Sequence, residues 1–143
     1  MKKQDWLLIY LSLPSQSPLM DPIRIMKGLF LFKMELGDEL KEFYDFVPYL
    51  YGPCSFEIYS DLSKLQLDNF VDEISLPFSR WSYYRLSERG QEESEKLKNA
   101  ATSDLVLKLI DIKRRVMSPP FLSLLREIYK KYPEYARSSV INF

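Results

Sequence analysis

The sequence predicts a mainly helical α+β fold in a single domain, and three observations lead to this prediction. Apolar residues recur at helical spacing in several separate segments of the chain. Residues 70–86 instead alternate polar and apolar side chains on both sides of a short turn, as a two-stranded hairpin does. The length of 143 residues fits one hydrophobic core. We expect residues 1–90 to form this core and residues 91–143 to extend it with further helices.

The first helix is expected over residues 4–12, which are mostly apolar. The run WLLIYLSLP is too short to span a bilayer, and no small-residue cleavage site follows it closely. We therefore interpret it as a buried helix, with a signal peptide as the alternative. The second helix is expected to begin at Asp21-Pro22, because Asp caps free backbone N–H groups and Pro suits the first helical position. Gly28 would let another backbone approach this helix, and Gly37-Asp38 would end or kink it.

The run FVPYLYGP predicts a short strand that breaks at Gly52-Pro53. A third helix is expected to follow, capped by Ser55 and ending near Leu67. Its spacing predicts three inward-facing residues, namely Ile58, Leu62 and Leu65. Four of its residues are expected to face outward, namely Tyr59, Ser60, Ser63 and Lys64.

Three helices are expected after the hairpin of residues 70–86. Residues 88–100 are polar, and their run of charges is typical of a solvated helix face. Residues 103–117 carry one apolar stripe, formed by Leu105, Leu109, Ile112 and Val116. A last helix is expected to begin at Pro119-Pro120 and to end at Pro133.

This order of elements is that of a winged helix-turn-helix with additional C-terminal helices. The helix from Ser55 to Lys64 would be the recognition helix, and the hairpin from Phe70 to Leu86 would be the wing. In this arrangement, Gly52-Pro53 would be the turn that orients the recognition helix.

The composition argues against catalysis and against a bound metal or cofactor. The chain has no histidine, one cysteine and four glycines, which removes most zinc sites, Ser-His or Cys-His nucleophiles and phosphate-binding glycine loops. The neighbouring acids Glu92-Glu93 and Asp72-Glu73 point apart on a helix and on a strand, so neither pair converges on a substrate. We expect no enzyme activity, no metal and no cofactor. A lone cysteine fits a reducing cytoplasm.

The formal net charge is zero, with 20 basic and 20 acidic residues. This balance disfavours strong non-specific binding of nucleic acid, which needs a basic surface. Residues 1–100 carry 12 basic and 16 acidic side chains, whereas residues 101–143 carry 8 and 4. Contact with a polyanion is therefore favoured at the C-terminal helices or on a local patch that the average conceals.

Four segments, in the same order, resemble the YwgA-like bacterial winged-helix proteins: DPIRIMKGLFLFKMEL, FVPYLYGPCSFEIYSDLSKL, YYRLSERG and YKKYPEYARSSVI. The Gly-Pro turn and the helix after it are also similar, more distantly, to the Panacea domain, which is linked to toxin–antitoxin systems. The resemblance implies a winged-helix architecture and no enzyme activity. Cys54 departs from the pattern, which has an aromatic or small residue at this position.

The first functional interpretation is a DNA-binding transcriptional regulator that reads double-stranded DNA with the third helix and the wing. Hydroxyl, lysine and arginine side chains suit contacts to phosphates and base edges. The predicted contacts are Ser55, Glu57, Ser60, Lys64, Arg80 and Arg85. The acidic residues Glu57, Asp61 and Asp68 oppose this interpretation, because carboxylates repel phosphate.

The alternative is a protein-interaction module, such as an antitoxin or a phage-defence adaptor. Neutral charge and ten tyrosines fit this role, because tyrosine and arginine are enriched at interface hot spots. Predicted contacts to a partner or to a second copy are Tyr59, Lys113, Arg114 and Arg115. A homodimer could form through the two apolar C-terminal helices.

Overall fold

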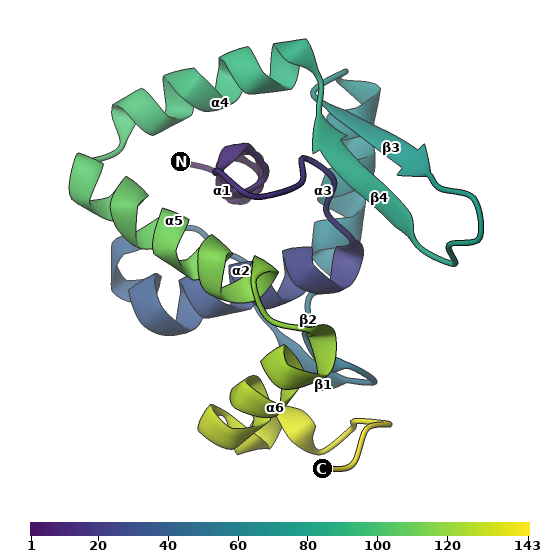
Figure 1. The fold of residues 1–143 in the computed structure, drawn as a ribbon. Helices are drawn as coiled ribbons and strands as arrows, with labels where there is room; N and C mark the ends of the chain where they lie inside the picture. Colours follow the sequence, from purple (N-terminus) through teal and green to yellow (C-terminus); the bar gives the residue numbers. More distant parts are fainter.

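Helix α1 (Lys3–Ser12) lies at the centre of the molecule, and helices α2 (Pro22–Leu36), α4 (Glu88–Ala100) and α5 (Ser103–Met117) surround it (Figure 1). The computed structural model describes residues 1–143 as a mainly helical α+β protein with two small antiparallel hairpins. All six residues from Trp6 to Leu11 are buried, so this helix is covered on every side. The prediction of a buried first helix is confirmed. None of the helices combines the length and the apolar character that a membrane crossing requires.

Helix α2 (Pro22–Leu36) begins as the sequence predicts. The Asp21 carboxylate accepts a hydrogen bond of 2.9 Å from the backbone N–H of Arg24, and Pro22 occupies the first helical position. A short 3-10 helix, η1 (Gly37–Glu39), follows directly. The prediction for Gly28 was wrong in one respect. The group that approaches it is the ring of Tyr10, a side chain rather than another backbone.

A two-stranded hairpin lies between α2 and the next helix. Strands β1 (Val47–Tyr49) and β2 (Gly52–Cys54) pair antiparallel, with Val47 opposite Cys54 and Tyr49 opposite Gly52. The predicted turn at Gly52-Pro53 was therefore wrong. These residues are paired within β2, and the chain turns one step earlier, at Leu50 and Tyr51. Gly52 has φ +94°, a conformation that a residue with a side chain rarely adopts.

Helix α3 (Phe56–Leu67) begins just after β2, and its predicted inward face is confirmed. Ile58, Leu62 and Leu65 are at most 1% exposed, because they pack into the core. Ser55 is the residue before the first helical turn, but its side chain makes no capping hydrogen bond, so that prediction was wrong. The residues between α2 and α3 thus include a hairpin, where a simple helix-turn-helix has a turn of three or four residues.

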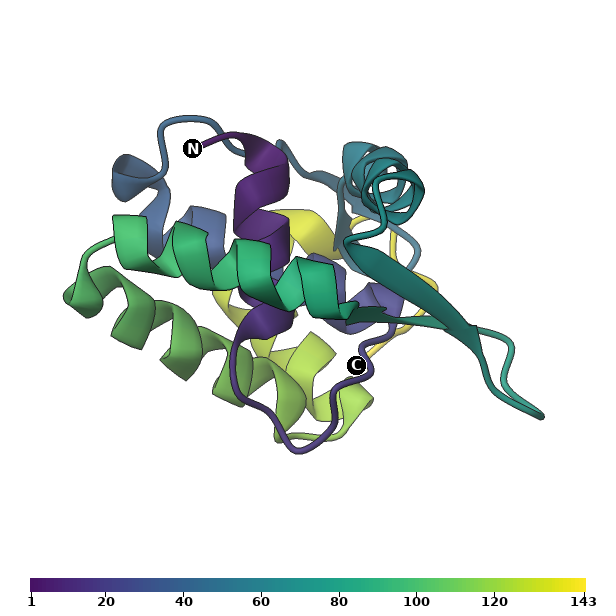
Figure 2. The ribbon, with the colours of Figure 1, turned by 90° about the horizontal axis from the view of Figure 1, so that it is seen from above.

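The predicted hairpin of residues 70–86 is confirmed. Strands β3 (Val71–Ser75) and β4 (Ser82–Leu86) pair antiparallel, and the loop between them projects away from the helices (Figures 1 and 2). Met20 forms an isolated bridge with Tyr84, through backbone hydrogen bonds of 2.9 and 2.8 Å. This bridge fixes β4 to the segment that joins α1 and α2.

The three C-terminal helices are confirmed as α4 (Glu88–Ala100), α5 (Ser103–Met117) and α6 (Phe121–Lys131), with a final 3-10 helix η2 (Pro133–Ala136). The predicted apolar stripe of α5 is buried, since its four residues are at most 8% exposed. Most of α4 is solvated, as predicted. Its buried residues Gly90 and Ser94 are the exception, and the Ser94 hydroxyl donates to the backbone oxygen of Leu8 in α1.

Gly28 provides a test of the contact between α1 and α2. A Cβ atom at this position would collide with the hydroxyl and ring of Tyr10, which is fully buried and has no room to move. We expect Gly28→Ala to lower the free energy of unfolding by about 1–3 kcal/mol through overpacking. Gly37→Ala is the matched control, because a Cβ atom added there would meet no atom within 4 Å. Urea unfolding of both variants measures the difference, and equal midpoints would contradict this packing.

Candidate functional site

Helix α3 presents three different stripes. Its apolar stripe faces the core, as described above. A second stripe is charged and includes Glu57, Asp61 and Lys64, which follow one another at helical spacing. A third stripe is exposed and begins with Phe56 and Tyr59, which are 54% and 41% exposed. The helix therefore shows solvent both aromatic rings and carboxylates.

Strand β1 extends the exposed rings of α3 into a continuous surface. The rings of Tyr49 and Phe56 meet edge to face with 5.1 Å between their centres. Val47 precedes Tyr49 by two residues, so both side chains leave the strand on the same side. We call Val47, Tyr49, Phe56 and Tyr59 the aromatic face. Each of these side chains is between 41% and 54% exposed, so the face is large and uncovered.

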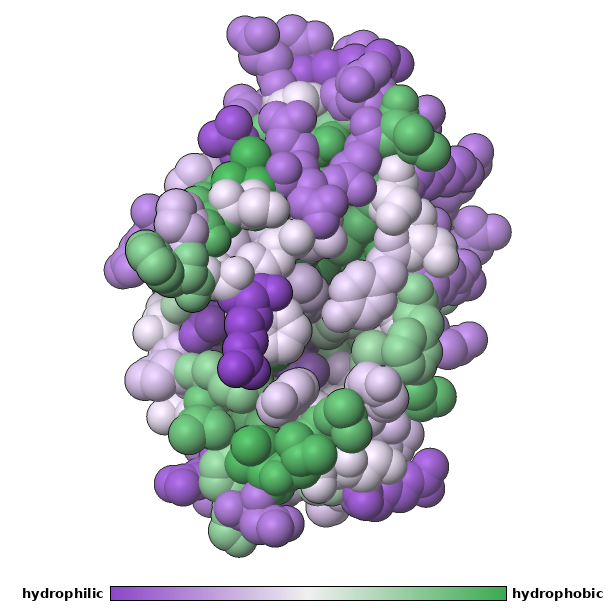
Figure 3. All heavy atoms as spheres, turned by 90° about the vertical axis from the view of Figure 1, so that its right-hand side faces the viewer, coloured by the Kyte–Doolittle hydropathy of each residue, from purple (hydrophilic) through white to green (hydrophobic).

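Further apolar residues lie around the tip of the β1–β2 hairpin. Figure 3 shows them gathered over the lower part of the surface, where this hairpin and the C-terminal tail lie. The tail is fixed there because the backbone N–H of Val140 donates to the oxygen of Leu50. The Tyr51 ring contacts the rings of Trp81 and Phe121, with centres 6.5 and 6.1 Å apart. The hairpin tip thus joins the start of β4, the start of α6 and the tail.

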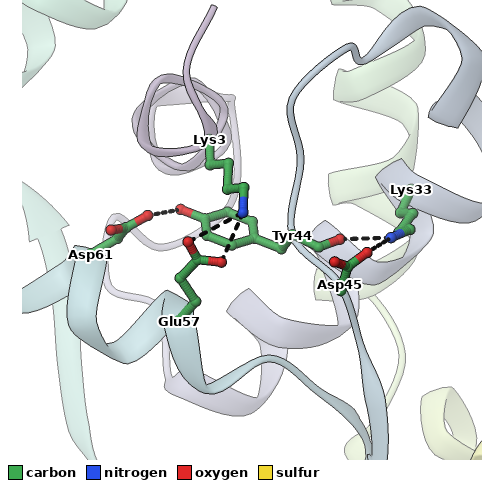
Figure 4. A network of polar contacts seen from close by, with 6 residues as sticks. All are labelled: Lys3, Lys33, Tyr44, Asp45, Glu57 and Asp61. Carbon is green, nitrogen blue, oxygen red and sulfur yellow. Dashed lines mark hydrogen bonds and ion pairs between the residues drawn. The ribbon is translucent and has the colours of Figure 1, made fainter.

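A network of polar contacts joins α1, α2 and α3 to the segment before β1 (Figure 4). Lys3 from α1 pairs with Glu57 at 3.0 Å, and the Tyr44 hydroxyl donates to Asp61 at 2.6 Å. Burial first, and then the hydrogen bond to Asp61, raises the pKa of Tyr44, so this residue remains a donor. The network fixes the position of α3 against α1 and against the segment before β1.

The same network holds the segment before β1 against α2. Lys33 donates to the backbone oxygen of Tyr44 and pairs with Asp45 (Figure 4). The contacts with Lys33 lower the pKa of Asp45, whose side chain is 93% exposed. Asp45 and Glu57 stand two residues before Val47 and one residue after Phe56 of the aromatic face, and Asp61 follows Glu57 on the same stripe of α3.

Acidic residues are concentrated in one segment of the sequence, although four of them pair with cations from other segments. Residues 37–75, which contain β1, β2, α3 and β3, carry nine acidic side chains and two basic ones, a net charge of −7. The acidic ones are Asp38, Glu39, Glu42, Asp45, Glu57, Asp61, Asp68, Asp72 and Glu73, and the basic ones are Lys41 and Lys64. A division of the sequence at residue 100 hides this concentration, because basic residues of the flanking segments dilute it.

The residues predicted to contact DNA do not form one basic surface. Ser55 is a correction, because it is only 4% exposed and cannot reach a ligand. Glu57 pairs with Lys3, and Arg85 lies 3.8 Å from Asp72 on the opposite strand. Ser60, Lys64 and Arg80 are exposed. Lys64 lies on α3 and Arg80 in the loop between β3 and β4, so two separated cations without an ion pair remain on this side.

The predicted contacts on α5 also separate into different environments. Lys113 is a correction, because it is 1% exposed and its ammonium donates to the backbone oxygens of Tyr10, Leu11 and Leu13. Arg115 pairs with Glu35 of α2 and with Asp111 of its own helix. Arg114 also pairs with Asp111 and is 69% exposed. Only Tyr59 among the predicted partner contacts lies on the aromatic face.

A second buried lysine supports the β1–β2 hairpin. Lys27 of α2 is 3% exposed, and its ammonium donates to the backbone oxygen of Pro53 at 3.0 Å. Sequence reasoning missed this role, although Lys27 follows Met26 within a nearly continuous apolar run. A lysine that is followed three and four residues later by Phe30 and Leu31, within such a run, is the signal that could have indicated it.

A cleft with a volume of about 1020 Å³ lies between the segment after α1, strand β4 and helix α4. Its charged lining includes Asp72, Arg85, Glu88 and Glu92. The lining also includes Ser12, Ser15, Ser17, Ser87 and Gln91. No group of three or more acidic or cysteine side chains is arranged to hold a metal ion.

Comparison with known proteins gives no assignment: no family model matches the chain, and no curated protein matches it in sequence.

The two buried lysines predict a specific dependence of stability on pH. Burial lowers the pKa of Lys27 to about 8 and, together with the nearby Lys98, that of Lys113 to about 8. Between this value and the ordinary lysine pKa, the unfolded chain binds more protons than the folded one. The free energy of unfolding therefore rises with pH across this window, by up to about 1.4 kcal/mol per pH unit for each lysine.

Urea unfolding from pH 7 to about pH 10 measures this effect. Burial raises the pKa of Cys54 and acts in the opposite direction, so the series uses a Cys54→Ala background. We expect Lys27→Met and Lys113→Met each to reduce the rise in stability with pH. Lys64→Met, at an exposed position, is the control and should leave the rise intact. The same slope in all three variants would contradict the assignment.

Proposed function

We propose that this chain is a non-enzymatic protein-interaction module of the cytoplasm, and that its aromatic face binds a partner protein. The observation that carries this proposal is the joint exposure of Tyr49, Phe56 and Tyr59 on a surface formed by two elements. Aromatic side chains supply much of the binding energy of protein interfaces, because each buries a large area at a small cost in conformational entropy.

The architecture that we propose is a winged helix with an inserted hairpin. Its supports are the order α1, α2, α3 and then the β3–β4 hairpin, and the packing of α3 against β3. The β1–β2 hairpin between α2 and α3 departs from the simple motif. Together with the resemblance to the YwgA-like and Panacea families, this arrangement supports an antitoxin or a phage-defence adaptor as the biological setting.

DNA binding is the second candidate function. It is favoured by the position of α3 beside a projecting hairpin, and by the exposure of Lys64 and Arg80. The excess of acidic side chains over residues 37–75 opposes it, because phosphates are repelled by carboxylates and five of the nine acids have no ion pair. We therefore rank partner-protein binding first.

A pair of experiments separates these two functions. The first captures partners from the host cell with immobilised protein, using chemical crosslinking and quantitative mass spectrometry. We expect the double variant Tyr49→Ala and Phe56→Ala to lose a partner that the wild type retains, because the paired rings are removed. Leu107→Ala is the control, since Leu107 is 65% exposed on α5, away from this face.

The second experiment titrates the protein with duplex DNA from its own upstream region and with random duplex, at two salt concentrations. We expect no sequence-dependent binding at either concentration. Tight binding to the upstream duplex that weakens with salt, and that Lys64→Glu and Arg80→Glu abolish, would establish the regulator instead.

A further inference from the structure

We propose that the partner presents a basic segment with arginine and apolar side chains to the aromatic face and its neighbouring carboxylates. The inference rests on the proposed protein-interaction function and specifies the chemistry of the partner. The observations that support it are the exposed rings, the carboxylates beside them and the sign of the surrounding charge.

The carboxylates beside the aromatic face retain capacity for further hydrogen bonds. Each carboxylate accepts about four hydrogen bonds, and Asp45 and Glu57 each make contact with a single lysine. Their side chains are 93% and 48% exposed, so an incoming guanidinium can reach them. These existing pairs are exposed to solvent and contribute little to stability. A partner cation can therefore share or replace the chain's own lysines.

Arginine fits this combination better than lysine does. Its planar guanidinium binds a carboxylate through two parallel hydrogen bonds and also stacks on aromatic rings. Glu57 follows Phe56 at the start of α3, so its carboxylate and the exposed ring leave the helix on adjoining stripes about 100° apart, and different side chains of one segment would contact them. Tyr49 adds a second ring in contact with the first. The apolar part of the face would be covered by apolar side chains of the same segment.

A second copy of this chain is a poor occupant of the surface. A symmetric dimer through this face would place one set of carboxylates against the same set, which is electrostatically unfavourable. The basic residues 101–143, with a net charge of +4, lie on other elements. A contact between the acidic surface of one copy and these helices of another would be head to tail, and would continue into a chain of molecules unless the rotation closed a ring. A different protein can cover the surface without such head-to-tail association.

The test uses two synthetic amphipathic helical peptides with the same leucine face. One carries arginine on its polar face and the other glutamate. Binding is measured by titration calorimetry at low and high salt, and the contact surface is mapped by amide NMR of the full chain. We expect the arginine peptide to bind, to weaken with salt, and to perturb residues 45–64. We expect the glutamate peptide not to bind.

Charge-removing variants identify the carboxylates. The double variant Asp45→Asn and Glu57→Gln should weaken the arginine peptide about tenfold, because two charge-assisted contacts are lost. Glu92→Gln on the distant helix α4 is the matched control and should not change the affinity. Perturbation of α4 rather than of residues 45–64, or equal binding of both peptides, would overturn the proposal. A protein that sediments as an oligomer through this face, or a DNA duplex that perturbs residues 45–64, would also overturn it.

The capture experiment distinguishes failure of this inference from failure of the proposed function. If Tyr49→Ala with Phe56→Ala loses the captured partner, while Asp45→Asn with Glu57→Gln retains it at every salt concentration, then the surface binds protein and the partner is not basic. If both double variants retain every captured protein, the proposed function itself fails.

Discussion

The contact between the Lys113 ammonium and the end of α1 is the interaction on which the rest of the fold depends. A helix leaves its last carbonyl groups without partners, and at the end of α1 the residues Leu11 and Leu13 are at most 7% exposed. Lys113 donates to Tyr10, Leu11 and Leu13 at 3.0, 3.3 and 2.7 Å. The positive charge also meets the negative end of the helix dipole, which partly offsets the cost of burying it. Helix α5 is thereby held against the N-terminal helix.

A central helix has consequences for the position of the surface elements. Because α1 is enclosed by α2, α4 and α5, it determines where α2 lies, and α2 in turn carries Lys27 and Lys33. Lys27 holds β2 through Pro53, and Lys33 holds the segment before β1. The aromatic face is thus positioned by two lysines of α2, which donate to backbone oxygens of the segment that carries the face. Such contacts fix a surface without using its exposed side chains, which remain free for a partner.

The helices were predictable because their signals are local. Asp21-Pro22, Ser87 and Thr102 each precede a helix, and apolar spacing indicates the buried face of α3 and α5. The β1–β2 hairpin was missed because Gly52-Pro53 is typical of a turn, whereas here the positive φ of Gly52 is accommodated inside a paired strand. The roles of Lys27 and Lys113 depend on backbone oxygens far away in the sequence, which no local pattern reveals.

The sequence predicted which elements of the candidate site lie at the surface, but it did not predict which side chains meet there. The sequence placed α3 and the β3–β4 hairpin at the surface, and it identified Tyr59, Ser60 and Lys64 as outward-facing. It did not indicate that Tyr49 and Phe56 would meet, because their contact requires the hairpin that was missed. A helix beside a hairpin is only a scaffold, and its side chains decide what it binds. On α3 those side chains are rings and carboxylates. Neither kind favours the binding of a polyanion unless cations outnumber the acids around the helix. Lys64 is the one lysine on this helix, whereas Asp61 and Asp68 have no ion pair, and this imbalance is the reason why we propose a cationic protein segment rather than a polyanion.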